Sequence, residues 1–233
     1  MSQTSEERRT NIQEHEGREP SEESLERRAR MVVRLKHEGV PTIDSLPVIE
    51  DSREAKVRPA DEVAKRAIAV CLTAAKGEGI DQATVDLLVR DYGANAFFSP
   101  KEAAFIKNPN PTQQELNGYS WRCEDYWVLL WALGYVDTLE RPEGQCNVPR
   151  AIKFLKDRTA VRFVQDAKLR PLASILNEAD LIYRYHWAVV DARVKGRDAP
   201  AKLDGGVVQE RHYALNWLVG YMDQAWDDIS TDT

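Results

Sequence analysis

The sequence lacks most of the features that assign a chain to a chemical class. Its 233 residues include only three cysteines, Cys71, Cys123 and Cys146, and no two of them form a CxxC pair. Neither a structural zinc motif nor a disulfide framework fits that spacing, so we expect reduced thiols and a cytoplasmic protein. The P-loop, GxGxxG, GxSxG and HExxH motifs are also absent, which removes the commonest signatures of nucleotide, hydrolase and metalloprotease chemistry.

The sequence also lacks a long apolar run and a strong charge of one sign. Its net charge is −6, and acidic and basic residues are mixed along the chain. That balance argues against nucleic acid or an anionic membrane surface as the main partner. The N-terminus is polar from residue 1, and no apolar run approaches the length of a membrane span. We therefore expect neither a secretory signal nor a membrane partner.

Strand-period alternation is absent, whereas helical stripes and helix-start signals recur along the chain. Ser99 with Glu102 and Thr112 with Glu115 are two capping boxes, in which a hydroxyl side chain and a glutamate satisfy the first backbone N–H groups of a helix. The sequence therefore predicts an all-α fold.

The most apolar segment, residues 126–133, has no polar face at helical spacing. Such a helix must be covered on all sides. It contains Trp127 and Trp131 and follows Trp121. We expect residues 21–233 to form a single compact multi-helix domain around this buried, Trp-rich central helix. Residues 1–20 are rich in Glu, Arg and Gln, and we expect them to be a disordered polar tail.

Further helices are predicted on both sides of this segment. Residues 22–38 place Leu25, Ala29, Val32, Val33 and Leu35 on one face, which we expect to be buried. Residues 171–195 and 207–222 carry long apolar stripes typical of core helices. Residues 160–168 fit either a helix or a short strand.

The last two predicted long helices also carry a polar cluster. Its members are Asp180, Arg184, His186, Asp191, Arg193, Glu210, Arg211, His212 and Asn216. One interpretation is a polar pocket, in which carboxylates tune imidazoles for acid–base chemistry or hold a metal. The other is a network of ion pairs and hydrogen bonds that locks two helices onto the core. We prefer the network.

Further expectations concern single members of the cluster. Asp191 and His212 should be at least half buried, and Asp180, nearer the helix start, should be more exposed. Glu210 and His212 are two residues apart, so they cannot share a helical face. We therefore predict neither a metal nor a cofactor.

The C-terminal end carries one large apolar side chain, Trp226, among polar residues. A freely solvated tail gains nothing from a tryptophan at that position. We expect Trp226 to anchor the tail to the helical body. It should thereby hold Asp227 and Asp228 near an arginine, either Arg193 or Arg211.

Short motifs in the C-terminal half are similar to those of a known family. They are Trp121-Arg122, Leu130-Trp131-Ala132-Leu133-Gly134, Asp180-Leu181, Tyr183-Arg184, His186-Trp187-Ala188, Asp191-Ala192-Arg193, Glu210-Arg211-His212, Ala214-Leu215-Asn216-Trp217, Trp226-Asp227-Asp228 and Thr231-Asp232-Thr233. From about Arg27 onward, the chain resembles the bacterial family called domain of unknown function 4272. The resemblance implies a bacterial, cytoplasmic, helical protein. It supplies no catalytic residue, because the family has no established activity.

Two hypotheses about function follow. In the first, the protein is a non-catalytic module that binds a protein or small-molecule partner through its last two helices and tail. In the second, it is a hydrolase-type enzyme that uses His186, Asp191, Glu210 and His212. An open pocket lined by these side chains would favour the enzyme, whereas buried, mutually paired side chains would favour the module.

Overall fold

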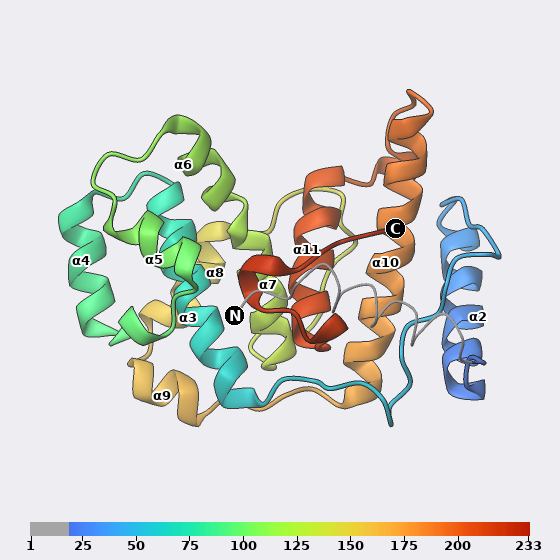
Figure 1. Ribbon diagram of the computed structural model, residues 1–233, viewed down its shortest axis with the longest axis horizontal. Helices are drawn as coiled ribbons and strands as arrows, with labels where there is room; N and C mark the ends of the chain where they lie inside the picture. Colours follow the sequence, from blue (N-terminus) through green and yellow to red (C-terminus); the bar gives the residue numbers. More distant parts are fainter. Residues whose placement is uncertain (1–18) are drawn as a thin grey trace. The chain divides into compact units, whose positions relative to one another are not determined.

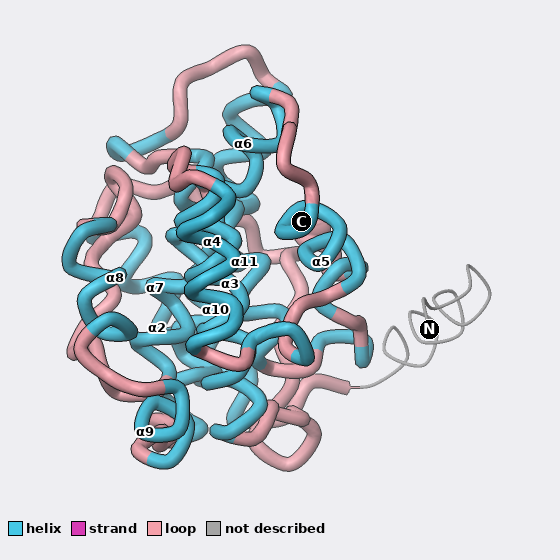
Figure 2. The backbone as a smooth tube through the Cα atoms, turned by 90° about the vertical axis from the view of Figure 1, so that its left-hand side faces the viewer, coloured by secondary structure: helices cyan, strands magenta, loops and turns pink. Residues whose placement is uncertain are grey.

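The structure is a computed structural model that describes residues 19–233, and these residues contain helices and loops without a β-strand (Figure 1, Figure 2). The predicted all-α class is confirmed. Nearly all of the predicted N-terminal tail lies outside the described residues. The chain divides into two compact units: unit 1 comprises Met1–Val57 and Pro171–Thr233, and unit 2 comprises Arg58–Arg170. A single domain over residues 21–233 stays a prediction.

The described part of unit 1, from residue 19 onward, contains three α-helices and three 3-10 turns. The helices are α2 (Glu22–His37), α10 (Leu172–Val194) and α11 (Gly205–Leu218), and the turns are Pro200–Lys202, Tyr221–Asp223 and Trp226–Asp228. Helix α10 packs against both α2 and α11. Asp204 is the N-cap residue of α11, and its carboxylate accepts hydrogen bonds from the backbone N–H groups of Gly206 and Val207.

The prediction for the buried face of α2 was right for Leu35, which is buried, but wrong for Leu25 and Val33, which are 37% and 68% exposed. Ser24 and Arg27 are buried in their place. Arg27 is stable there because its guanidinium donates to the Glu50 carbonyl (2.8 Å) and to the Glu23 carboxylate (2.7 Å). The apolar pattern did not predict this face correctly, because Arg27 is buried on the strength of its hydrogen bonds and not of apolar character.

Unit 2 contains the other helices. They are α3 (Ala60–Gly77), α4 (Gln82–Asp91), α5 (Pro100–Lys107), α6 (Gln113–Ser120), α7 (Arg122–Ala132), α8 (Val148–Lys156) and α9 (Ala160–Gln165), with a 3-10 turn at Ala94–Ala96. Both predicted capping boxes form, at Ser99 and Thr112. The ambiguous residues 160–168 contain the helix α9.

Helices α3 and α7 form the centre of unit 2. Every residue from Cys123 to Ala132 of α7 is buried. Leu133 is buried as well, so the burial predicted for the apolar residues 126–133 is confirmed. Helix α3 is covered even more widely, because α4, α5, α6, α7, α8 and α9 all contact it. Its buried Lys76 donates from Nζ to the carbonyl oxygens of Phe105, Ile106 and Asn108, at 2.8, 2.9 and 2.6 Å. These bonds fix the chain at the end of α5.

Two glycines of unit 2 give a matched test of this packing. A Cβ atom added to Gly77 on α3 would lie 2.7 Å from the Tyr119 carbonyl carbon, whereas one added to Gly118 on α6 would meet nothing within 4 Å. We expect Gly77→Ala to lower the free energy of unfolding by about 1–3 kcal/mol through overpacking. Gly118→Ala should raise it by about 0.5–1 kcal/mol, because alanine is the better helix former. Urea unfolding of both variants measures the contrast, and equal effects would contradict the close approach of α3 and α6.

Candidate functional site

Asp180 and Arg184 form a buried ion pair within α10. The guanidinium donates from Nε to Oδ2 (2.9 Å) and from Nη2 to Oδ1 (2.8 Å), and the two side chains are 1% and 3% exposed. Arg184 Nη2 also donates a hydrogen bond to the Pro47 carbonyl oxygen, 3.4 Å away. The expectation that Asp180 is more exposed than Asp191 was wrong. The bidentate pairing compensates for the removal of both charges from water.

His186 and His212 form a second buried pair, between α10 and α11. Their Nδ1 atoms are 2.8 Å apart, and the rings meet edge to face with centroids 5.0 Å apart. One Nδ1 must carry a proton and donate a hydrogen bond to the other Nδ1, which is unprotonated and accepts it. Two cationic rings could not make this bond.

Burial favours the neutral form of both imidazoles. Burial, reinforced by the nearby positive charge of Arg193, lowers the pKa of His186 to about 4. Burial and the neighbouring His186 lower the pKa of His212 to about 3, against an opposing hydrogen bond with Asn216. Both rings are therefore neutral at pH 7.

Asp191 does not belong to the histidine pair. It forms ion pairs with Lys195 (2.6 Å) and Arg197 (3.3 Å), and its side chain is 20% exposed. Arg193 is exposed and Glu210 is half-buried, whereas Arg211 is buried. The structure therefore brings together Asp180 with Arg184 and His186 with His212, but it does not bring Asp191 to either imidazole.

The C-terminal segment is anchored as its tryptophan suggested. Trp226 is 5% exposed, and its ring packs edge to face against Tyr213 and Trp217, with centroids 5.1 and 5.3 Å away. The Tyr213 hydroxyl donates to the Trp226 carbonyl. Further along, Asn216 Nδ2 donates to the Ser230 carbonyl at 2.9 Å. An arginine partner for Asp227 and Asp228 stays a prediction.

The geometry of the polar cluster suits a structural role better than a catalytic one. A general base needs an imidazole or carboxylate within reach of a substrate proton. Here the two buried imidazoles bond each other, and the buried carboxylate of Asp180 bonds Arg184. Each bonded pair joins segments of unit 1: Arg184 reaches the loop at Pro47, and the histidines link α10 to α11.

Sequence reasoning missed one group of potential ligands, in unit 2. The side chains of Cys123, Glu124 and Cys146 converge there, with their donor atoms within 4.8 Å of one another. Cys146 lies 23 residues after Cys123, so the sequence offers no metal-site spacing. The only local signal is the adjacent Cys-Glu pair at the start of α7.

The contrast between Asp180 and Asp191 gives a test of the network. Asp180→Asn leaves the buried guanidinium of Arg184 without its carboxylate, and we expect a loss of about 3–5 kcal/mol in the free energy of unfolding. Asp191→Asn breaks only partly exposed ion pairs, which contribute about 0–1 kcal/mol. Denaturant unfolding at pH 7 measures both. Equal losses in the two variants would show that burial does not set the strength of these pairs.

Comparison with known proteins identifies the family of the chain. No curated protein and no solved structure matches the chain. Within residues 19–233, none of the helices combines the length and the apolar character needed to cross a membrane. The family match covers most of the chain and includes the whole of α10 and α11. The chain belongs to the family described as Domain of unknown function (DUF4272), which it matches over residues 27–229.

Proposed function

We propose that the protein is a non-catalytic module that binds another protein in the bacterial cytoplasm. The observation that carries the proposal is the closure of the polar cluster, since Asp180 and both histidines are buried and bonded to cluster members. A hydrolase would need such groups to face a substrate. The cytoplasm is supported by the three free cysteines and the bacterial source by the family resemblance.

The exposed face of α2 is the binding surface that this proposal favours. Leu25, Ala29 and Val33 recur every four residues on this face, and all three are exposed. Side chains four apart on a helix lie above one another and form a continuous stripe. A stripe of this kind is what a partner helix covers when it packs along an amphipathic surface. The binding surface that we propose is therefore on α2, whereas the sequence favoured the last two helices and the tail.

Charged residues border the stripe and would set the register of a partner. Glu26 and Arg30 lie on the exposed side of α2, and their side chains form an ion pair at 3.9 Å. A pair of this kind contributes little to stability, about 0–1 kcal/mol. Its charges therefore remain available to complementary charges on a partner, which confer specificity more than affinity.

Charge substitutions in the stripe test the proposal. We expect Val33→Glu and Leu25→Glu to abolish capture of the specific partner from a lysate of the source bacterium, because each places a charge in the apolar contact. Val161→Glu is the matched control, since Val161 is a 63% exposed helical valine in unit 2. Quantitative mass spectrometry of the captured proteins measures the difference.

The outcomes separate the two classes of function. A partner that binds the parent and the Val161 variant, but neither α2 variant, supports the module. Capture unaffected by both α2 substitutions would contradict this surface. Hydrolysis of chromogenic esters or phosphate esters by the purified chain, lost in a folded His212→Asn variant, would replace the module with the enzyme.

A further inference from the structure

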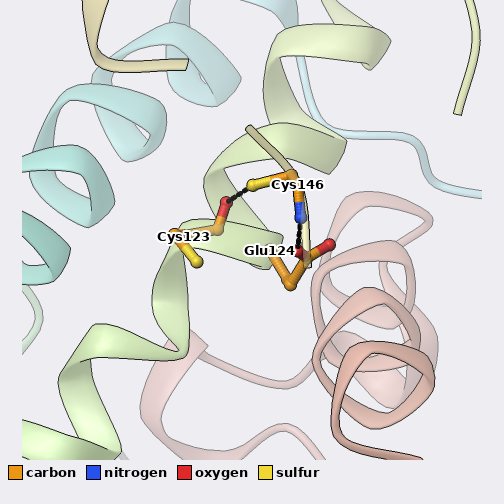
Figure 3. A group of neighbouring side chains, drawn as sticks. All are labelled: Cys123, Glu124 and Cys146. Atoms are coloured by element: carbon orange, nitrogen blue, oxygen red, sulfur yellow. Dashed lines mark hydrogen bonds between the residues drawn. The ribbon is translucent and has the colours of Figure 1, made fainter. Parts of the chain in front are cut away.

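Two cysteines and a glutamate converge at the start of α7, within unit 2 (Figure 3). Cys123 and Glu124 belong to the first turn of α7, and Cys146 lies just before the N-cap residue of α8. The backbone N–H of Cys146 donates to the Glu124 carboxylate. The Cys146 thiol donates to the Cys123 carbonyl oxygen at 3.6 Å. Two bonds therefore fix Cys146 against the helix.

The separation of the donor atoms is close to that of a bound ion. Both sulfur atoms and a carboxylate oxygen lie within 4.8 Å of one another. Zinc binds thiolate at about 2.3 Å and carboxylate oxygen at about 2.0–2.2 Å, so two sulfurs on one tetrahedral ion are about 3.8 Å apart. Binding would therefore draw the donor atoms together by about 1 Å at most, through rotation of side chains such as that of Cys146.

We propose that Cys123, Glu124 and Cys146 form a binding site for a zinc ion. Two thiolates and one carboxylate are a donor set that zinc accepts, and they exclude magnesium and calcium, which prefer oxygen ligands alone. Three protein ligands leave the fourth position of a tetrahedral ion for water or another group. Cys146 is partly exposed, so an ion reaches the buried Cys123 and Glu124 from its side.

The carboxylate distinguishes this site from a redox pair. Disulfide formation requires a thiolate, and an anionic group beside a thiol opposes its deprotonation. A divalent cation reverses this effect, because the same carboxylate attracts it and it displaces the thiol protons. Binding therefore releases protons and tightens as the pH rises.

The ion would fasten a long connection in unit 2. Residues 133–147 join α7 to α8, and Cys146 is near their end. A bond from Cys146 through the ion to the first turn of α7 closes this loop on itself. Closing a loop of this length restricts the unfolded chain, so ligand binding should raise the stability of the folded protein.

Cobalt(II) is the probe for this site, because its thiolate complexes absorb in the near ultraviolet. We expect the reduced parent chain to bind one Co²⁺ with sulfur-to-cobalt charge-transfer bands, and excess Zn²⁺ to displace it. Cys146→Ser leaves one thiolate, so it should lower the intensity of the bands at saturating Co²⁺, and it should weaken Zn²⁺ binding more than about 100-fold, since the loss of an outer-shell partner alone weakens it 10–100-fold. Glu124→Gln should weaken binding while keeping the sulfur bands. Cys71→Ala is the matched control, because Cys71 is a buried cysteine outside the cluster, and it should bind like the parent.

A second measurement uses the parent chain alone and does not depend on how the variants fold. Zn²⁺ should protect Cys146 from alkylation by iodoacetamide, as followed by peptide mass spectrometry, and it should raise the melting temperature. The absence of charge-transfer bands and of protection in the parent would overturn the proposal. Equal binding by a folded Cys146→Ser variant would also overturn it, as would rapid formation of a Cys123–Cys146 disulfide in the presence of saturating Zn²⁺.

Discussion

A buried cationic side chain is stable only where it finds acceptors, and in this chain the acceptors include backbone carbonyl groups of loops. In unit 1, Arg27 bonds the carbonyl of Glu50 and Arg184 bonds that of Pro47. Both carbonyls lie in the connection that follows α2. In unit 2, Lys76 donates to the carbonyl groups of Phe105, Ile106 and Asn108. Arg170 donates to the carbonyl groups of Trp131, Val136 and Asp137. Arg27 and Arg184 thus join a helix to a loop. Lys76 joins α3 to the end of α5, and Arg170, in the loop after α9, joins that loop to the end of α7 and the residues after it.

This constraint changes the meaning of charged residues on the core helices. Asp180, Arg184, His186 and His212 fall on faces of α10 and α11 that are buried. A cluster of acids, bases and imidazoles in such a place resembles an active site in composition. Its bonds are internal, however, and the lowered pKa values of the histidines follow from burial without a substrate. The function is better sought on exposed faces, such as the outer face of α2.

Local signals in the sequence predicted much of the fold. The two capping boxes and the apolar residues 126–133 depend on neighbours within a few residues, and the structure confirms them. Predictions that depended on distant partners were less successful. Helix α2 buries Arg27 because Glu50 lies beside it, and Asp180 is more buried than Asp191 because Arg184 pairs with it. The approach of Cys146 to Cys123 depends on the course of a long loop, which no periodicity encodes.

The histidine pair gives the most direct test of the claim that the polar cluster is structural. Nitrogen-15 NMR of the His186 and His212 side chains, recorded from pH 8 to pH 3, reports the protonation and tautomer of each ring. We expect two neutral rings through pH 5, one protonated on Nδ1 and its partner accepting there, with pKa values of about 4 for His186 and about 3 for His212. A ring that gains its proton near the ordinary histidine pKa of about 6.5 would be open to solvent and available for acid–base chemistry, and it would contradict the account.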